Sequence, residues 1–151
     1  MEGQVNMITL CVPSRGRPTL AKRFYDSVMA TCSDVKNVEV RFYLNEDDPS
    51  LNDYLKNIGK ANIWVGPHQS TSFSWNRLAL RAKHDIVCLM GDDVQIKTKN
   101  WDQKIYEEFE NVNDKLLMVV PWTGRPRGYS DSQLELHGRY VCKKNEDLPS
   151  P

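Results

Sequence analysis

The sequence predicts an α/β fold built around a largely parallel sheet. Short apolar segments alternate with segments of helical spacing along most of the 151 residues, and polar residues directly follow several of the apolar segments. This alternation is typical of right-handed β-α-β crossovers. The length suits one domain. We expect that domain over residues 1–144 and a disordered tail over 145–151.

Five segments have the length and composition of strands. Val38–Leu44 alternates apolar and polar residues, which predicts a half-covered strand near an edge of the sheet. Ile86–Met90 is apolar throughout and stops at Gly91, which predicts a strand buried on both faces. The other expected strands are Met7–Val12, which ends at Pro13, Ala61–Val65 and Leu116–Val120.

Four segments between or beside these strands have apolar residues at helical spacing. Each follows a residue whose side chain can cap a helix, and we expect Thr19, Ser50, Ser72 and Asn100 to be these caps. The residues expected on the buried sides are Leu20, Phe24 and Val28, then Leu51, Tyr54, Leu55 and Ile58, then Phe73, Leu78 and Ala82, and finally Trp101, Ile105 and Phe109.

Composition excludes few classes of function. Basic and acidic residues both number 20, so no net charge favours nucleic acid or membrane surfaces. No apolar run is long enough to span a bilayer, and the N-terminus lacks a signal pattern, so we expect a cytoplasmic protein without a membrane partner. The cysteines form no Cys-x-x-Cys pair, and Cys11 and Cys88 lie in apolar segments, which favours buried reduced thiols.

Polar loops follow three of the expected strands. They are Ser14–Arg17, Asn45–Asp48 and Asp92–Asp93. The carboxyl ends of parallel strands share one edge, so these loops should face one crevice. Arginine suits phosphate oxygens, and paired carboxylates suit Mg²⁺ or Mn²⁺. Taken singly, each loop has an alternative interpretation as a solvated loop or turn.

Four segments together resemble the GT-A glycosyltransferases. They are Val12–Pro18, Leu44–Pro49, Ser74–Arg77 and Leu89–Val94. The likeness is to small family-2-like enzymes, including those encoded by bacteriophages, and it covers about Ile8 to Val120. It implies a GT-A (Rossmann-like) three-layer αβα sandwich with a mostly parallel sheet that binds a nucleotide sugar such as a UDP-sugar. A phage-encoded enzyme of this kind would act in the host cytoplasm.

The resemblance also implies roles for individual residues. Asp93 would contact a Mn²⁺ or Mg²⁺ ion, with Asp92 and His137 as further candidate metal ligands. Asp47 would contact the base or ribose. The residues implied to bind the nucleotide sugar are Pro13, Ser14, Arg15, Arg17, Asp47, Asn76, Arg77 and Asp92.

The chain departs from the family pattern in two ways. Gly91 stands where the family usually has its first metal-binding aspartate, and the chain ends at Pro151, soon after the segment that matches the family. Family members usually carry a general base in the following segment, and the sequence identifies no catalytic base here. His137 matches the late metal-ligating histidine of the family, and a surface histidine is the alternative interpretation.

Two hypotheses of function follow. The first is an enzyme that moves a sugar from a nucleoside diphosphate sugar to an acceptor hydroxyl with help from a divalent metal. The second is a nucleotide-sugar-binding module without catalysis, or a subunit that a partner completes. The sequence does not decide whether the acceptor is a modified DNA base, a glycan or a small molecule. It also leaves open whether the chain forms a homo-oligomer. A receiver domain, a dinucleotide-binding Rossmann domain and a zinc hydrolase fit the motifs less well.

Overall fold

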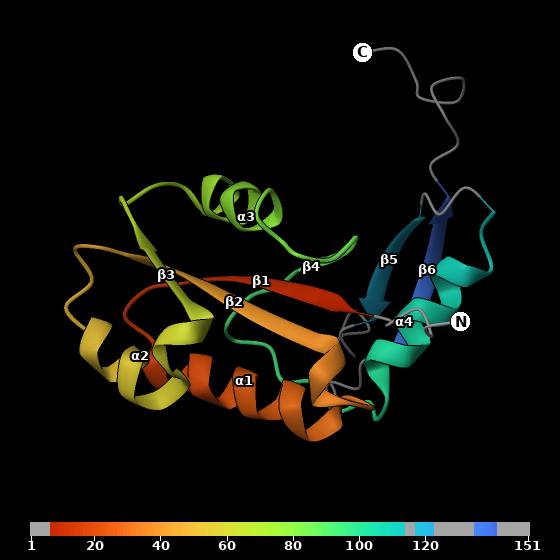
Figure 1. Ribbon diagram of the computed structural model, residues 1–151, viewed down its shortest axis with the longest axis horizontal. Coiled ribbons are helices and arrows are strands. Elements are labelled where there is room, and N and C mark those ends of the chain that lie inside the picture. The colour runs from red at the N-terminus through yellow and green to blue at the C-terminus, as the bar shows by residue number, and fades with distance from the viewer. Residues whose placement is uncertain (1–6, 114–116, 123–134, 142–151) are drawn as a thin grey trace, which may run out of the picture.

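The computed structural model describes residues 7–113, 117–122 and 135–141, with side chains for the first of these ranges. Its centre is a sheet of four parallel strands in the order β3-β2-β1-β4 (Figure 1). An α/β fold with a parallel sheet is therefore confirmed. The strands are β1 (Ile8–Ser14), β2 (Val38–Asn45), β3 (Ile63–Gly66) and β4 (Ile86–Leu89).

Helices lie on both faces of this sheet (Figure 1). The helix after β1 and the helix after β2 pack against each other on one face, and the helix after β3 packs against β1 and β2 on the other. These helices are α1 (Pro18–Thr31), α2 (Leu51–Ile58) and α3 (Thr71–Ala79).

The side-chain alternation of the strands explains why two layers of helices form. Successive residues of a strand point to opposite faces of the sheet. Leu10 and Phe42 therefore enter the main core with α1 and α2, whereas Cys11 and Tyr43 pack with Leu78 of α3. The first core is the larger one, and it also takes in the apolar side of α4 (Trp101–Glu110).

The order of the strands reverses at β1. From β1 the chain moves outward through β2 to β3, and then returns to form β4 on the other side of β1. In open sheets of this kind, ligands bind beyond the carboxyl ends of the two strands that flank the reversal. The topology therefore directs attention to the space after Ser14 of β1 and Leu89 of β4.

The first strand is longer than predicted. It runs through Pro13 to Ser14, beside Tyr43 and Leu44 of β2. Its pairing with β4 stops at Cys11, so Pro13 has a neighbouring strand on one side only. A residue without a backbone N–H is tolerated where one side of the strand is open.

The predicted edge position of the second strand and the predicted burial of the fourth strand on both faces are wrong, whereas the half-covered pattern of the second strand holds over Val38–Arg41. The second strand was expected near an edge, but β2 lies between β1 and β3. Because β3 pairs only with Phe42–Asn45, the polar residues Glu39 and Arg41 lie beyond its end and stay half-buried. The fourth strand was expected to be buried on both faces. However, α3 lies mainly over β1 and β2, and 53% of Leu89 in β4 is exposed.

Two helices begin earlier than predicted. The first begins at Pro18, with Arg17 rather than Thr19 at the N-cap. Proline suits the first helical position because its fixed φ matches the helix and its missing N–H has no partner there. The third begins at Thr71, with Ser70 rather than Ser72 as the N-cap. The Ser70 hydroxyl accepts a hydrogen bond from the backbone N–H of Phe73.

The remaining helix starts agree with the sequence. Ser50 is the N-cap of α2 and Asn100 that of α4, although neither side chain makes a capping hydrogen bond. Asn100 has a φ of 54°, a left-handed conformation that asparagine tolerates better than most residues. Short 3₁₀ turns at Val35–Asn37 and Lys60–Asn62 lead into β2 and β3.

The last two strands form a separate antiparallel pair. They are β5 (Leu117–Trp122) and β6 (Glu135–Val141), and β5 does not join the parallel sheet as the sequence suggested. No strand was predicted at β6. The expected tail over 145–151 lies outside the described residues. Among the helices that the structure describes, none combines the length and apolar character needed to cross a bilayer.

Candidate functional site

A pocket of about 300 Å³ lies at the carboxyl ends of the parallel strands, at the reversal of strand order. Such a volume is at the lower end of the range for small-molecule sites. Residues at the carboxyl ends of β1 and β2, and residues that follow β1, β3 and β4, contribute to its wall. They are Pro13, Ser14, Arg15, Arg17, Tyr43, Asn45, His68, Gln69, Thr71, Ser74, Trp75, Met90, Gly91, Asp92 and Asp93.

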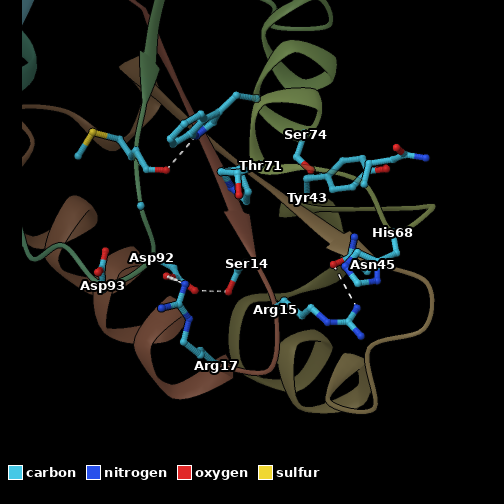
Figure 2. A pocket seen from close by; sticks show the side chains of 15 residues that line it. Ser14, Arg15, Arg17, Tyr43, Asn45, His68, Thr71, Ser74, Asp92 and Asp93 are labelled. Atoms are coloured by element: carbon cyan, nitrogen blue, oxygen red, sulfur yellow. Dashed lines mark hydrogen bonds and ion pairs between the residues drawn. The ribbon is translucent and has the colours of Figure 1, made fainter.

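The Asp92 carboxylate is the most buried acidic group of this pocket, with 1% of its side chain exposed. Its Oδ2 accepts a hydrogen bond from the Ser14 hydroxyl, with 2.5 Å between the oxygens. Its Oδ1 lies 2.7 Å from a terminal nitrogen of Arg17. That oxygen has no hydrogen bond within the described residues, so the Arg17 contact is an ion pair without hydrogen-bond alignment. Figure 2 shows the three side chains meeting at one side of the pocket.

Tyr54 of α2 is hydrogen-bonded to two residues of this group. Its hydroxyl lies 2.7 Å from the Ser14 hydroxyl and accepts a hydrogen bond of 2.8 Å from the backbone N–H of Arg17. Burial raises the pKa of the Tyr54 hydroxyl, so the group stays neutral and can donate to Ser14. The loop after β1 is therefore fixed to α2 and to the loop after β4 through one connected set of hydrogen bonds.

Arg15 lies on the other side of the pocket. Its two terminal nitrogens donate to the Asp47 carboxylate at 2.5 and 3.3 Å, and one of them also donates to Oδ1 of Asn45 at 3.2 Å. His68 Nδ1 lies 3.4 Å from the same carboxylate. The hydrogen bond from Arg15 lowers the pKa of Asp47. Ion pairs at such exposed positions are weak, so Arg15 can exchange Asp47 for a bound anion at little cost.

Asp48, the next residue in the chain, stabilises the local backbone. It is buried, and its carboxylate accepts hydrogen bonds of 2.8 Å from the backbone N–H of Gly16 and from that of Ser50. It thereby ties the loop after β1 to the start of α2. The alternative interpretation of this acidic stretch as a turn holds for Asp48, since a side chain that bonds the backbone two residues on makes an Asx turn.

One wall of the pocket is aromatic, and the sequence did not identify it. The Trp75 indole N–H donates to the Met90 carbonyl oxygen at 3.1 Å, which joins α3 to the end of β4. The Tyr43 hydroxyl donates to the Pro67 carbonyl oxygen at 3.0 Å and so fixes the loop that carries His68. An alternation of polar and apolar residues does not reveal which aromatic rings will end beside a cavity.

Not all of the sequence-predicted site residues line the pocket. Pro13, Ser14, Arg15, Arg17, Asp92 and Asp93 do. Asp47 is not among the lining residues, but it pairs with Arg15. Asn76 and Arg77 are exposed on α3, where the Arg77 guanidinium lies 5.5 Å from the centre of the Phe73 ring. His137 falls in β6, whose side chains lie outside the described part of the structure.

The acidic pair after β4 fits a two-carboxylate metal site poorly. Both oxygens of Asp92 already face protein partners, and Gly91 offers no carboxylate. A Cβ on Gly91 would lie 2.8 Å from Oδ1 of Asp93, so the glycine leaves room for that carboxylate. Among the described residues, no three histidine, cysteine, aspartate or glutamate side chains could together hold a metal ion. A role for Asp93 in binding Mn²⁺ or Mg²⁺ stays a prediction from the sequence.

The combination of features is a small pocket at the reversal of a parallel sheet, with two arginines, a buried carboxylate and an aromatic wall. Such a site can bind an anionic ligand with a planar group. Comparison of the chain with models of protein families and with curated proteins finds no match to either.

Proposed function

We propose that this pocket binds a nucleoside diphosphate sugar and that the protein transfers the sugar to an acceptor hydroxyl. One observation carries the proposal: Arg15 and Arg17 converge with Asp92 and Trp75 on one pocket at the reversal of strand order. This is the position at which open α/β sheets bind nucleotides. The motif resemblance to GT-A glycosyltransferases, carried by the same loops, supports the same class of ligand.

The two arginines suit the diphosphate. Arginine remains charged at any physiological pH, and its planar group binds phosphate oxygens through two parallel N–H groups. Arg15 and Arg17 approach the pocket from one loop, and that loop is fixed by Tyr54 and Asp48. During transfer, negative charge grows on the leaving diphosphate. Fixed cations at that point stabilise the transition state without reorganisation.

The aromatic wall suits the planar part of the ligand. Trp75 is half-buried and its ring is oriented by the hydrogen bond to Met90. Pockets for small molecules combine such apolar surfaces with a few fixed polar groups. Asn45 and His68 supply polar groups nearby.

Calorimetric titration tests the binding step. We expect uridine diphosphate, or another nucleoside diphosphate, to bind the wild-type protein and to bind the Arg15→Gln variant about tenfold more weakly, as loss of a charge-assisted hydrogen bond implies. The control is Lys22→Gln, which removes one positive charge from the exposed side of α1, where Lys22 pairs with Asp26. Absence of binding for all nucleoside diphosphates would refute the proposal.

A second function is a module that binds the nucleotide sugar without turnover. One observation favours it: Ser14 and Arg17 already occupy the carboxylate of Asp92, which the resemblance makes a candidate metal ligand. Release of nucleoside diphosphate from a bound sugar donor separates the two. Release, to water or to an added acceptor, supports the enzyme, and binding without release supports the module.

A further inference from the structure

The buried carboxylate of the pocket already has a cation beside it. Arg17 lies 2.7 Å from Oδ1 of Asp92, and the Ser14 hydroxyl donates to Oδ2. A carboxylate with 1% exposure is costly to keep charged unless a positive group compensates it. Arg17 is that group in this protein.

We infer that Arg17 takes the place of a divalent metal, so that the diphosphate of the ligand binds without Mn²⁺ or Mg²⁺. The inference rests on the proposed function, because it concerns how the same pocket holds the same class of ligand. It departs from the expectation that the sequence motif around Asp92 and Asp93 raised.

The position of Arg17 supports this role. Its side chain is 51% exposed and lines the pocket, so only part of the guanidinium faces Asp92. The contact with Asp92 involves one terminal nitrogen of the guanidinium. Arginine carries five donors, enough to hold a buried carboxylate and a phosphate oxygen at the same time. The loop position is fixed, because the Arg17 backbone N–H donates to Tyr54.

The surroundings argue against a metal at the same point. A divalent ion on Asp92 would have to displace Arg17 or lie beside its positive charge. The Asp93 carboxylate makes no hydrogen bond or ion pair within the described residues, and Figure 2 shows it set apart from the Ser14–Asp92–Arg17 group. One exposed carboxylate is a weak ligand for Mg²⁺, which gives up its water reluctantly.

The test is titration of uridine diphosphate, and of the other nucleoside diphosphates if it does not bind, into four proteins. These are the wild type, Arg17→Gln, Asp93→Asn and the control Lys22→Gln. Each titration is run once with EDTA and once with Mn²⁺. Arg17 is half-exposed, and the melting temperature of its variant, measured without ligand, shows whether the fold is kept.

The expected results are distinct for each protein. Three proteins should each bind the nucleoside diphosphate as tightly with EDTA as with Mn²⁺. They are the wild type, Asp93→Asn and Lys22→Gln. Arg17→Gln should bind about tenfold more weakly with EDTA. Mn²⁺ should recover part of that loss, because removal of the guanidinium opens Asp92 to a metal ion.

Two results would overturn the inference while the proposed function survives. One is wild-type binding that requires Mn²⁺ and is lost in Asp93→Asn. The other is a folded Arg17→Gln protein that binds as tightly as the wild type in EDTA. A failure of every nucleoside diphosphate to bind, with or without Mn²⁺, refutes the proposed function itself and this inference with it.

Discussion

The Ser14 hydroxyl at the end of β1 donates a hydrogen bond of 2.5 Å to Asp92, which follows β4 and lies 78 residues further along the chain. The bond crosses the point at which the strand order reverses. It joins the two strands that flank the pocket, and both side chains are buried. The same hydrogen bond therefore affects both the stability of the fold and the shape of the candidate site.

Ser14→Ala should lower the free energy of unfolding by about 1–3 kcal/mol, because it leaves a buried oxygen of Asp92 without a donor. Urea denaturation followed by fluorescence measures the change. Ser72→Ala is the matched control, since Ser72 is exposed on α3 and should change the same free energy by less than about 0.5 kcal/mol. Equal effects of the two substitutions would contradict the prediction.

Gly66→Ala should lower the free energy of unfolding by about 1–3 kcal/mol, as overpacking does. A Cβ at this position would lie 2.4 Å from the Tyr43 hydroxyl oxygen and 2.9 Å from the ring carbon that carries it. Tyr43 is buried between the sheet and α3, so its ring has little room to move.

Two comparisons make the test of Gly66 specific. The change should be smaller when Gly66→Ala is made in a Tyr43→Phe background, which a double-mutant cycle measures. Gly91→Ala should cost less, because its Cβ would meet only the flexible end of Asp93. Thermal unfolding ranks the stability of four variants: Gly66→Ala, Tyr43→Phe, the double variant and Gly91→Ala. A Gly91→Ala protein less stable than Gly66→Ala would refute this account.

The stability that Glu39 provides should be lost at acidic pH. Burial opposes the charge of Glu39, but hydrogen bonds from Arg41 and Thr9 outweigh it and hold its pKa below the ordinary value of 4.5. As the pH falls, the Glu39 carboxylate is therefore protonated at a higher pH in the unfolded chain than in the folded protein. The contribution is complete well above pH 4.5 and disappears as the pH falls through the lowered pKa.

Comparison of wild type with Glu39→Gln measures this effect. The difference in unfolding free energy between the two proteins should shrink as the pH falls below the ordinary carboxylate pKa of 4.5. A difference that stays constant down to the acid unfolding of the protein would contradict the assignment.

The thiols of β1 and β4 should react slowly with alkylating reagents at neutral pH. Burial raises the pKa of Cys11 to about 11 and that of Cys88 to about 12, which leaves little of the reactive thiolate. Iodoacetamide labelling followed by mass spectrometry of the peptides should show both protected in the native protein and both labelled in urea. Rapid native labelling of Cys11 would contradict its burial in the sheet.

The parallel sheet was predictable because its signal is local and repeated. Each strand from β1 to β4 is a short apolar or alternating segment that precedes a helical one, so their existence follows from the sequence alone. The side-chain burial of β4 was not predictable in the same way. Its apolar residues suit two covered faces, but α3 covers β1 and β2 instead, and that placement depends on the whole fold.

The pocket was predictable in part. The loops after β1 and β4 were identified, since the carboxyl ends of parallel strands converge. The pairing of side chains within the pocket was not predictable, because it depends on loop geometry. Arg17 faces Asp92. Asp48 binds backbone N–H groups, whereas Asp47 stays exposed. Trp75 reached the pocket wall through the position of α3, which no residue spacing encodes.

The hydroxyl of Tyr54 has a consequence for the order in which the protein folds. It bonds to Ser14, 40 residues earlier in the chain, and Ser14 bonds in turn to Asp92. Contacts between residues so far apart in sequence form late, because the chain between them must first be ordered. The pocket should thus be completed only after β4 has docked beside β1. A truncated or partly folded chain would lose ligand binding before it lost its helices.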